Sequence, residues 1–342
     1  MENMKFLRRK GRKYSKRVGL TYDLKTDFVF KEDDPKDANA EFDHPETIEY
    51  IREALFWGGH KVEKIGNLKN LLNRLNSLNV DIVFNISEGM KGRNRESEIP
   101  NILEASGIPY VGADALTLGL TLDKILAKKV FVFHDVATPR FWETNGVPIN
   151  RKLPLNFPVI VKPRYEGSSK GITERSVVTN VKDLKKQAEW VERTYSQPAL
   201  IEEFIEGKEF TVAVWGNDHP EALPVVQISI NGNLDIGRQY YTFSHITSNT
   251  LDYICPAEVT KGVAKKLQDL AVRAYKAVEC RDFGRVDIRM DKEGNAYVLE
   301  VNPLPSLSVE DVFIVLARHM GVTYNEVINQ ILDYALQRYG IT

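Results

Sequence analysis

The sequence has few cysteines, almost no net charge and no long apolar run. Two cysteines occur among 342 residues, Cys255 and Cys280, and neither belongs to a CxxC or Cys/His cluster. A disulfide framework or a zinc site is therefore disfavoured, and the reducing cytoplasm is the expected location. The formal net charge of −1 gives no overall field that would recruit nucleic acid. No apolar stretch approaches the roughly 20 residues that span a bilayer, so we expect no membrane segment.

The first 17 residues differ from the rest in their positive charge. They hold eight basic side chains and almost no residue that could be buried: Lys5, Arg8, Arg9, Lys10, Arg12, Lys13, Lys16 and Arg17. A solvated, flexible extension is favoured over an arm that binds anions or RNA.

Strand-like and helix-like segments alternate in the first third of the chain. A β-prone run at Val18–Tyr22 precedes Asp43-His44-Pro45-Glu46, which we interpret as a capping box that opens a helix. Further segments follow: a strand at Val62–Ile65, a helix at Leu68–Leu78 and a buried strand at 81–85. This βαβαβ order predicts a parallel sheet flanked by helices, and the absence of GxGxxG gives no support for a dinucleotide site.

The pattern changes after a Gly- and Pro-containing break at Gly107–Gly112. We predict short strands at Phe157–Lys162, Ala199–Glu203, Phe210–Trp215 and Val225–Ile230, a loop at Asn231–Asp252 and a hairpin of Gly284–Met290 with Ala296–Val301. Helices are predicted at Leu122–Val136, Val259–Val278, Glu310–Met320 and Tyr324–Tyr339. The fold class is therefore α/β together with α+β, with units at 18–118, 119–214 and 215–342.

The strand Phe157–Lys162 ends in a lysine and leads into the loop Glu166-Gly167-Ser168-Ser169-Lys170-Gly171. Burying a lysine at the end of an apolar strand is costly unless it meets an anion. The backbone N–H groups and hydroxyls of a Gly- and Ser-rich loop can surround a polyphosphate. A plain β-turn would explain the loop but leaves Lys162 unexplained, so we favour phosphate binding.

The predicted hairpin carries a second polar group, in which Glu300 and Asn302 share one face because strand side chains alternate. Asp287, next to Arg285 on the partner strand, can reach the same face. Two carboxylates and an amide oxygen are ligands that suit Mg²⁺ bound together with substrate phosphates. A solvated polar face is the alternative interpretation.

A third segment, Leu200–Phe210, is an apolar strand that ends in acids. Its backbone could read an adenine, and Glu209 could accept hydrogen bonds from ribose hydroxyls. A strand-turn-strand with exposed acids explains the same pattern equally well.

In this order and spacing the three segments resemble the ATP-grasp superfamily, and within it the D-alanine–D-alanine ligase family, from about Ile82 to the end of the chain. The resemblance implies an ATP-grasp fold that follows an N-terminal parallel α/β domain. It also implies an ADP-forming ligase that activates a carboxylate as an acyl phosphate and joins it to an amine.

The same resemblance assigns roles to individual residues. It implies that two Mg²⁺ ions, replaceable by Mn²⁺, bind Asp287, Glu300 and Asn302, and that Arg285 and Ser168 act in catalysis. The residues that it implies for ATP are Lys124, Lys162, Gly167, Ser168, Ser169, Glu202, Glu203, Phe204, Ile205 and Glu209.

The substrate positions depart from the family pattern. Glu41 or Glu46 would have to replace the family glutamate that holds the first substrate's amino group. The family's Lys-Tyr pair falls on His245 and Ile246, so the tyrosine is missing unless Tyr240 or Tyr241 takes its place.

Two further substitutions fall close to the catalytic residues. Ser306 stands for the glycine that supplies an oxyanion-hole N–H, which a serine keeps. Asp311 replaces the serine that binds the acceptor's carboxylate, and an aspartate there would repel a carboxylate by several kcal/mol. The equal alternative is that Asp311 only caps a helix.

The favoured hypothesis is a carboxylate–amine ligase with substrates other than two D-alanines, assembled as a homodimer like its relatives. A true D-alanine–D-alanine ligase is the first alternative. An ATP-binding regulator without chemistry, and an RNA-associated protein acting through its basic start, are alternatives from other classes.

Overall fold

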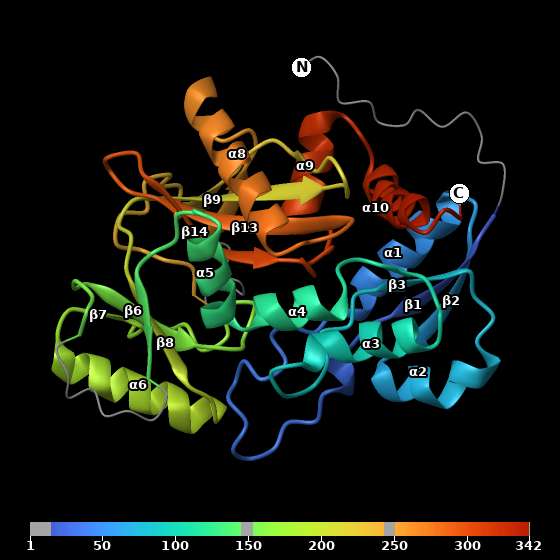
Figure 1. The fold of residues 1–342 in the computed structure, drawn as a ribbon, viewed down its shortest axis with the longest axis horizontal. Coiled ribbons are helices and arrows are strands. Elements are labelled where there is room, and N and C mark those ends of the chain that lie inside the picture. The colour runs from blue at the N-terminus through green and yellow to red at the C-terminus, as the bar shows by residue number, and fades with distance from the viewer. Residues whose placement is uncertain (1–14, 145–152, 243–249, 342) are drawn as a thin grey trace.

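The computed structural model describes residues 15–144, 153–242 and 250–341. These residues form a parallel sheet followed by two antiparallel sheets, each covered by helices (Figure 1). Of the basic segment at the start, 1–14 lies outside the described residues, and Arg17 already belongs to the first strand, where it pairs with Asp81 at 2.8 Å. In the described part of the chain no helix combines the length and the apolar character needed to cross a bilayer.

The first sheet has four parallel strands in the order β2-β1-β3-β4, as the βαβαβ pattern predicts. Its strands are β1 (Arg17–Thr21), β2 (Lys61–Gly66), β3 (Ile82–Asn85) and β4 (Tyr110–Val111). One face packs on α1 (Pro45–Trp57) and α10 (Tyr324–Arg338), and the other on α2 (Leu68–Arg74) and α3 (Glu98–Ala105). The amide of Asn329 in α10 donates to the carbonyl of Ala54 in α1 at 2.6 Å, which ties the last helix to the first.

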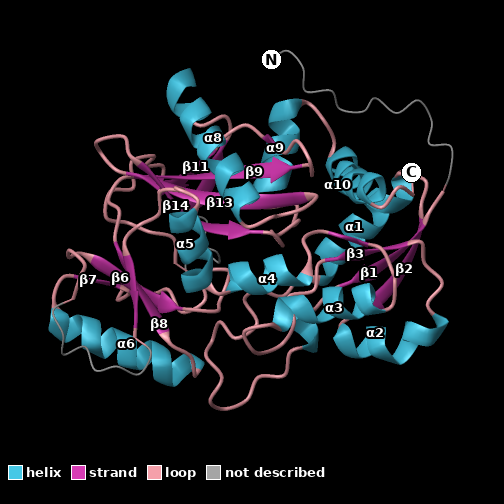
Figure 2. Ribbon diagram, in the orientation of Figure 1, coloured by secondary structure: helices cyan, strands magenta, loops and turns pink. Residues whose placement is uncertain are grey.

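The second sheet is antiparallel, in the order β5-β8-β6-β7. Its strands are β5 (Phe141–Glu143), β8 (Ala199–Glu203), β6 (Val159–Pro163) and β7 (Val177–Val178). The amphipathic helix α6 (Val181–Tyr195) covers one face, with Leu184 and Val191 packed on the strands (Figure 2). The opposite face is left for the cavity described below.

The third sheet has six antiparallel strands, with β12-β11-β9-β13-β14 in line and β10 beside β9. They are β9 (Lys208–Trp215), β10 (Glu221–Ala222), β11 (Val226–Ile230), β12 (Leu251–Ile254), β13 (Phe283–Met290) and β14 (Ala296–Asn302). Helices α5 (Lys124–Phe133) and α8 (Lys261–Ala277) pack on one face, while α4 (Ala115–Leu122) and α9 (Val312–Met320) lie toward its ends (Figure 1). The predicted hairpin is present, and Gly294 takes the left-handed backbone conformation that its turn requires (φ 82°).

Short 3-10 turns at Lys25–Asp27, Leu75–Ser77 and Arg95–Ser97 complete the elements. The second of these turns ends the helix that we predicted to continue to Leu78.

Two predicted helix starts are wrong. The capping box at Asp43 is not formed, because His44 precedes the helix, Pro45 is its first residue and no side chain caps it. The helix predicted at Glu310 begins at Val312, since Asp311 accepts a hydrogen bond from the Val312 N–H and acts as the cap.

The helix predicted at Leu122–Val136 is two helices with a break at Asp123. Asp123 is fully buried, caps α5 through the Leu126 N–H and accepts two hydrogen bonds from the guanidinium of Arg164, at 2.6 and 2.8 Å. The break therefore comes from a contact with a residue distant in the sequence, at the edge of the second sheet.

Candidate active site

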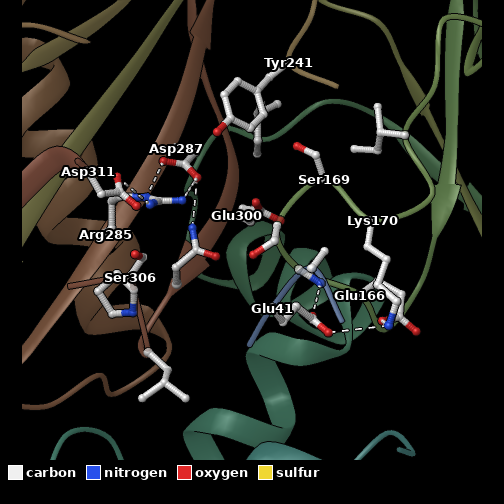
Figure 3. A pocket seen from close by; sticks show the side chains of 18 of the residues that line it. Glu41, Glu166, Ser169, Lys170, Tyr241, Arg285, Asp287, Glu300, Ser306 and Asp311 are labelled. Carbon is white, nitrogen blue, oxygen red and sulfur yellow. Dashed lines mark hydrogen bonds and ion pairs between the residues drawn. The ribbon is translucent and has the colours of Figure 1, made fainter. Parts of the chain in front are cut away.

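A cavity of about 870 Å³ lies between the second and third sheets and the segments that follow β1 and β3 of the first sheet, and side chains from all of these line it. The sixteen predicted site residues that the structure describes all line this cavity, from Lys124 in α5 to Asp311 at the start of α9. His245, the seventeenth, lies outside the described residues. Positions spread over nearly 190 residues of sequence thus share one space (Figure 3).

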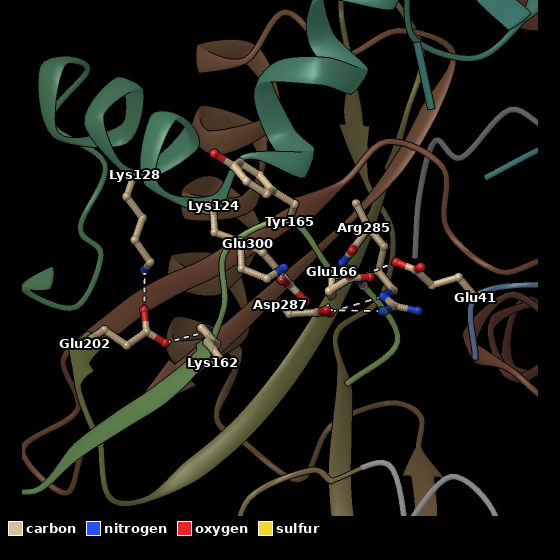
Figure 4. A network of polar contacts seen from close by, with 12 residues as sticks. Glu41, Lys124, Lys128, Lys162, Tyr165, Glu166, Glu202, Arg285, Asp287 and Glu300 are labelled. Carbon is tan, nitrogen blue, oxygen red and sulfur yellow. Dashed lines mark hydrogen bonds and ion pairs between the residues drawn. The ribbon is translucent and has the colours of Figure 1, made fainter. Parts of the chain in front are cut away.

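At one end of the cavity a buried carboxylate holds two lysines. Glu202 in β8 lies 2.5 Å from Lys162 in β6 and 2.7 Å from Lys128 in α5 (Figure 4). Burial acts to raise the pKa of Glu202, but Lys128 and Lys162 outweigh it and the pKa falls below its ordinary value. Burial lowers the pKa of Lys128 to about 8, against the attraction of Glu202. Glu202 therefore fixes the position of Lys162, whose ammonium lines the cavity.

The Gly- and Ser-rich loop after β6 has the shape of an anion-binding loop. Ser168, Ser169 and Gly171 all have positive φ angles, of 46°, 54° and 75°. Two of its backbone N–H groups donate to carboxylates from the β1–α1 connection: Gly167 to Glu41 at 2.5 Å and Gly171 to Asp37 at 2.8 Å. The loop is thus built to meet oxyanions, and protein carboxylates bind it in this structure.

An aromatic wall lies at the end of β8. The ring of Phe204 meets Tyr240 edge to face, with centroids 5.6 Å apart, and the guanidinium of Arg289 lies 4.6 Å from the Phe204 ring centre. Arg289 in turn pairs with Glu209 at 3.7 Å. Phe204, Ile205 and Glu209 thus combine a flat apolar surface with one carboxylate, which suits a purine nucleoside.

The hairpin brings the predicted metal ligands together, because Asp287 is the register partner of Glu300, and Arg285 that of Asn302. Asp287 accepts from the amide of Asn302 at 2.9 Å and from the hydroxyl of Thr211 at 2.7 Å. Glu300 is 2.5 Å from Lys124. Burial opposes its ionisation, but Lys124 and then Lys162 prevail and lower its pKa to about 2.

These oxygen donors fit a hard divalent cation. No group of three or more His, Cys, Asp and Glu side chains suited to a metal occurs among residues 15–144, 153–242 and 250–341. A metal here would therefore be shared by two carboxylates, the Asn302 amide and the phosphates of a nucleotide.

Comparison with known proteins decides the family. Residues 130–333 match the family described as D-ala D-ala ligase C-terminus. The chain is 34% identical over 259 residues to the D-alanine–D-alanine ligase of Bordetella petrii, which covers 75% of this chain and 76% of the relative. The chain belongs to the D-alanine–D-alanine ligase family. It is thereby an ATP-dependent, ADP-forming carbon–nitrogen ligase by class, and ATP with a divalent metal are the cofactors of that class.

Other similarities extend this result without fixing a substrate. An uncharacterized protein, y4sG, of Sinorhizobium fredii is 36% identical over 259 residues, 75% of each chain. The ATP-bound D-alanine–D-alanine ligase of Bacillus anthracis has the same fold, with a TM-score of 0.71 and 22% identity over 95% of this chain and 99% of that one. The VanG D-Ala:D-Ser ligase of Enterococcus faecalis matches with a TM-score of 0.71 and 21% identity over 94% of this chain and all of the other.

Asp311, one of the positions at which the sequence departs from the family pattern, lies beside Arg285 in the cavity. Asp311 caps α9 and also pairs with Arg285, whose Nη1 lies 3.7 Å from Oδ1 (Figure 3). Burial works against the charge of Arg285, but Asp287 and Asp311 raise its pKa above the ordinary value. Asp311 is therefore a helix cap that also lines the cavity.

Tyr240 and Tyr241, either of which could replace the missing loop tyrosine, have different contacts. Tyr240 donates to the carbonyl of Thr173 at 2.7 Å, which ties it to the loop before β7. Tyr241 is hydrogen-bonded to Tyr253 and lies within electrostatic range of Asp311 and Arg285. Burial raises its pKa to about 12, so its hydroxyl keeps its proton. Of the two tyrosines, Tyr241 is therefore the one that lies near Asp311 and Arg285.

Glu41 and Glu46, the two candidates for the family's N-terminal glutamate, lie in different places. Glu41 lines the cavity, whereas Glu46 is exposed on α1 and borders a different surface hollow. Glu41 is 2.5 Å from Arg95 and 3.6 Å from Lys170. Burial acts to raise the pKa of Glu41, but Arg95 and Lys170 outweigh it and keep the carboxylate charged.

Sequence reasoning missed four charged residues beside these: Arg95, Glu96 and Lys128, which are buried, and Glu88, which is partly buried. A signal existed for Lys128, because it follows Lys124 by one helical turn in a helix whose other residues, apart from Lys129, are apolar, and would face the same way. For the others the signal was their position after β3, since ligands of parallel sheets bind beyond the carboxyl ends of strands.

Proposed function

We propose that this protein activates a carboxylate with ATP and Mg²⁺ and joins it to an amine that is not D-alanine. One observation supports an acceptor other than D-alanine: Asp311 lies 3.7 Å from Arg285, in the part of the cavity that we propose binds the acceptor and call the acceptor end. A substrate carboxylate about 4 Å from an isolated aspartate would be repelled by about 4 kcal/mol at an effective dielectric constant near 20. Arg285 offsets part of this repulsion, but its one positive charge is shared by Asp311 and Asp287. An acceptor without a carboxylate at that position, or with a cationic group there, avoids this cost.

The proposed reaction has two steps. A carboxylate oxygen of the donor attacks the γ-phosphorus, and ADP leaves while Lys124 and Lys162 offset the negative charge of the phosphates. The amine nitrogen then attacks the acyl carbon, phosphate leaves, and the nitrogen loses a proton. Arg285 and the Ser306 N–H would stabilise the oxygen that becomes negative in this second step, and Ser168 would belong to the hydrogen-bond network of the catalytic site. Metal bound by Asp287, Glu300 and Asn302 would add positive charge beside the transferring phosphoryl group.

Several finer features belong to the same proposal. They are two Mg²⁺ ions with Mn²⁺ as a substitute, the nucleotide roles of the residues around Phe204, three units at 18–118, 119–214 and 215–342, a homodimer, and a cytoplasmic location. The two free cysteines are compatible with that compartment.

The test is ADP release with Mg-ATP across a panel of carboxylates and amines, with hydroxylamine added to trap an acyl phosphate as the hydroxamate. We expect carboxylate-dependent ADP release and hydroxamate formation. A thermal shift by Mg-ATP without turnover of any carboxylate would instead identify an ATP-binding regulator.

The acceptor is tested with Asp311→Ser and with Asp311→Asn, which removes the same charge without changing the size of the side chain. We expect Asp311→Ser to increase the use of D-alanine as acceptor by at least about tenfold, because the repulsion is removed. A true D-alanine–D-alanine ligase, the alternative suggested by the names of the Bordetella relatives, would use D-alanine best as the wild type and lose it on substitution.

A further inference from the structure

Two carboxylates at the N-terminal side of the cavity have no use in the proposed reaction. Glu88 follows β3, and Glu96 lies in the 3-10 turn Arg95–Ser97. Asp23 fixes the first of these segments, since it accepts from the Ser87 hydroxyl at 2.5 Å and from the Gly89 N–H at 2.9 Å. Gly89 allows the two segments to meet, because a Cβ there would lie 2.5 Å from the Arg95 carbonyl oxygen. The backbone thus holds Glu88 and Glu96 beside each other.

The charged side chains around Glu88 and Glu96 form ion pairs with one another. Glu41 is paired with Arg95 at 2.5 Å, and Glu166 with Lys170 at 2.7 Å. The other charged groups on this side cancel as well: Lys25 lies near Asp43, and Lys124 is bound to Glu300 at 2.5 Å. Glu88 and Glu96 therefore remain as two carboxyl groups that no cation of this region binds closely, whereas Asp23, the third carboxyl here, is bound by the Ser87 hydroxyl and the Gly89 N–H.

Glu96 is 7% exposed, and its small exposed area opens into the cavity. Within the described residues its carboxylate accepts no hydrogen bond, and the nearest cation, Arg95, lies 3.9 Å away and is bound by Glu41. Glu88 also lines the cavity, and the described part of the chain offers it neither a hydrogen bond nor an ion pair. A nine-tenths buried carboxylate without a hydrogen bond is costly unless a ligand supplies the donor.

We propose that the carboxylate donor is a basic amino acid, whose two positively charged nitrogens are bound by Glu88 and Glu96. This inference rests on the proposed ligase function and names its donor class. A side-chain ammonium and a guanidinium share the required chemistry, and the two carboxyl groups without a close cation call for two cationic centres rather than one.

Glu88 and Glu96 lie where the carboxylate donor, rather than the amine acceptor, is expected to bind. Glu41 and Glu96 are both within electrostatic range of Lys124, which is expected to contact the phosphates that the donor must attack. The acceptor end, with Arg285 and Asp311, is drawn on the other side of Glu300 from Glu41 and Glu166 (Figure 3). Burial, and then the neighbouring carboxylates, raise the pKa of Glu88, as expected of a carboxyl that has no cation of its own.

The experiment uses hydroxylamine as the nucleophile, so that the natural acceptor need not be known. Hydroxamate is measured with Mg-ATP and the D- and L-forms of lysine, ornithine and arginine, of alanine, and of norleucine, which has the length of lysine without its second ammonium. 1,5-Diaminopentane carries both cations without the carboxylate. We expect at least one basic amino acid to exceed norleucine by about tenfold or more in kcat/KM, and the diamine to inhibit without forming a product.

Variants of the two glutamates test their roles directly. Glu88→Gln and Glu96→Gln should each reduce the preference for the basic amino acid over norleucine by about tenfold or more, while Glu53→Gln should leave it unchanged. Glu53 is a suitable control because it lies on α1 in the same unit, with its side chain 64% exposed.

The outcomes separate the two proposals. Hydroxamate from alanine or norleucine at the rate of the basic amino acids keeps the ligase function and overturns the donor assignment. No hydroxamate from any carboxylate overturns the ligase function itself. If the glutamate variants do not fold, the comparison of lysine with norleucine in the wild-type protein still decides the donor class.

Discussion

Replacing Glu96 by glutamine should stabilise the protein, by an amount that grows with pH. Burial, with Glu41 as a further contribution, raises the pKa of Glu96 from 4.5 to about 7, although Arg95 and Lys124 act in the other direction. The folded state therefore holds the proton more tightly than the unfolded state. The stabilisation contributed by this carboxyl is complete below pH 4.5 and is lost as the pH rises through 7. Each unit by which the pKa in the folded state exceeds the pKa in the unfolded state changes the free energy of unfolding by about 1.4 kcal/mol.

The expected difference follows from these two values. Glu96→Gln cannot ionise, so its free energy of unfolding should exceed that of the wild type by about 1 kcal/mol at pH 5 and about 3 kcal/mol at pH 8. Urea unfolding of both proteins, followed by tryptophan fluorescence at several pH values, measures it. Glu53→Gln should track the wild type throughout. If the difference in free energy of unfolding between Glu96→Gln and the wild type stays constant from pH 5 to pH 8, the pKa of Glu96 is not raised by folding and the reasoning is wrong.

Three further predictions concern the framework of the site. Lys128→Met removes the ion pair with Glu202 and the hydrogen bond to Thr138; because Lys162 still pairs with Glu202, we expect a loss of about 1–3 kcal/mol in urea unfolding and a raised KM for ATP. Asp123→Ala leaves Arg164 without its buried partner and α5 without its cap, and should cost about 3–5 kcal/mol, with Asp123→Asn intermediate. Gly207→Ala puts a Cβ 2.2 Å from the Met290 carbonyl oxygen at φ 145° and should lower the melting temperature by several degrees, whereas Gly262→Ala, whose nearest neighbour is 4.0 Å away, should not.

The elements that the sequence predicted well are those determined by local pattern. The β13–β14 hairpin has alternating side chains and a turn with Asp, Gly and Asn, so its presence follows from neighbouring residues. The pairing of Asp287 with Glu300 depends in addition on a one-residue shift in register between Asp287 and Ile288, which the alternating pattern does not show. The parallel sheet follows from short buried strands between amphipathic helices. Lys162 could be found because a lysine that ends an apolar strand is costly to bury without an anion beside it.

The features that the sequence did not predict depend on contacts between residues that are distant in the chain. Nothing in the apolar pattern around Leu122 shows that the helix breaks at Asp123, because Arg164, which binds Asp123, lies 41 positions away. Asp43 has the sequence pattern of a helix cap, but its backbone N–H and C=O bond Asp23 and Lys25, and the helix starts two residues later.

Glu88, Arg95 and Glu96 had the appearance of solvated charges in a Gly-containing loop. Only the packing of the β1–α1 connection against the Gly- and Ser-rich loop encloses them, and no local pattern reports that packing.

The hydrogen bond between Gly167 and Glu41 has a consequence for the order of events in a reaction cycle. One N–H cannot serve a protein carboxylate and a nucleotide phosphate at full strength, so a phosphate that binds this loop through Gly167 must exchange with Glu41. Glu41 belongs to the unit that carries Glu88 and Glu96, and through Arg95 it is linked to both. If a nucleotide phosphate takes the Gly167 N–H as we propose, Glu41 must release it, and the contacts of Glu41 with Arg95 would change at the same time. Binding of the nucleotide would thereby alter the surroundings of the proposed donor site.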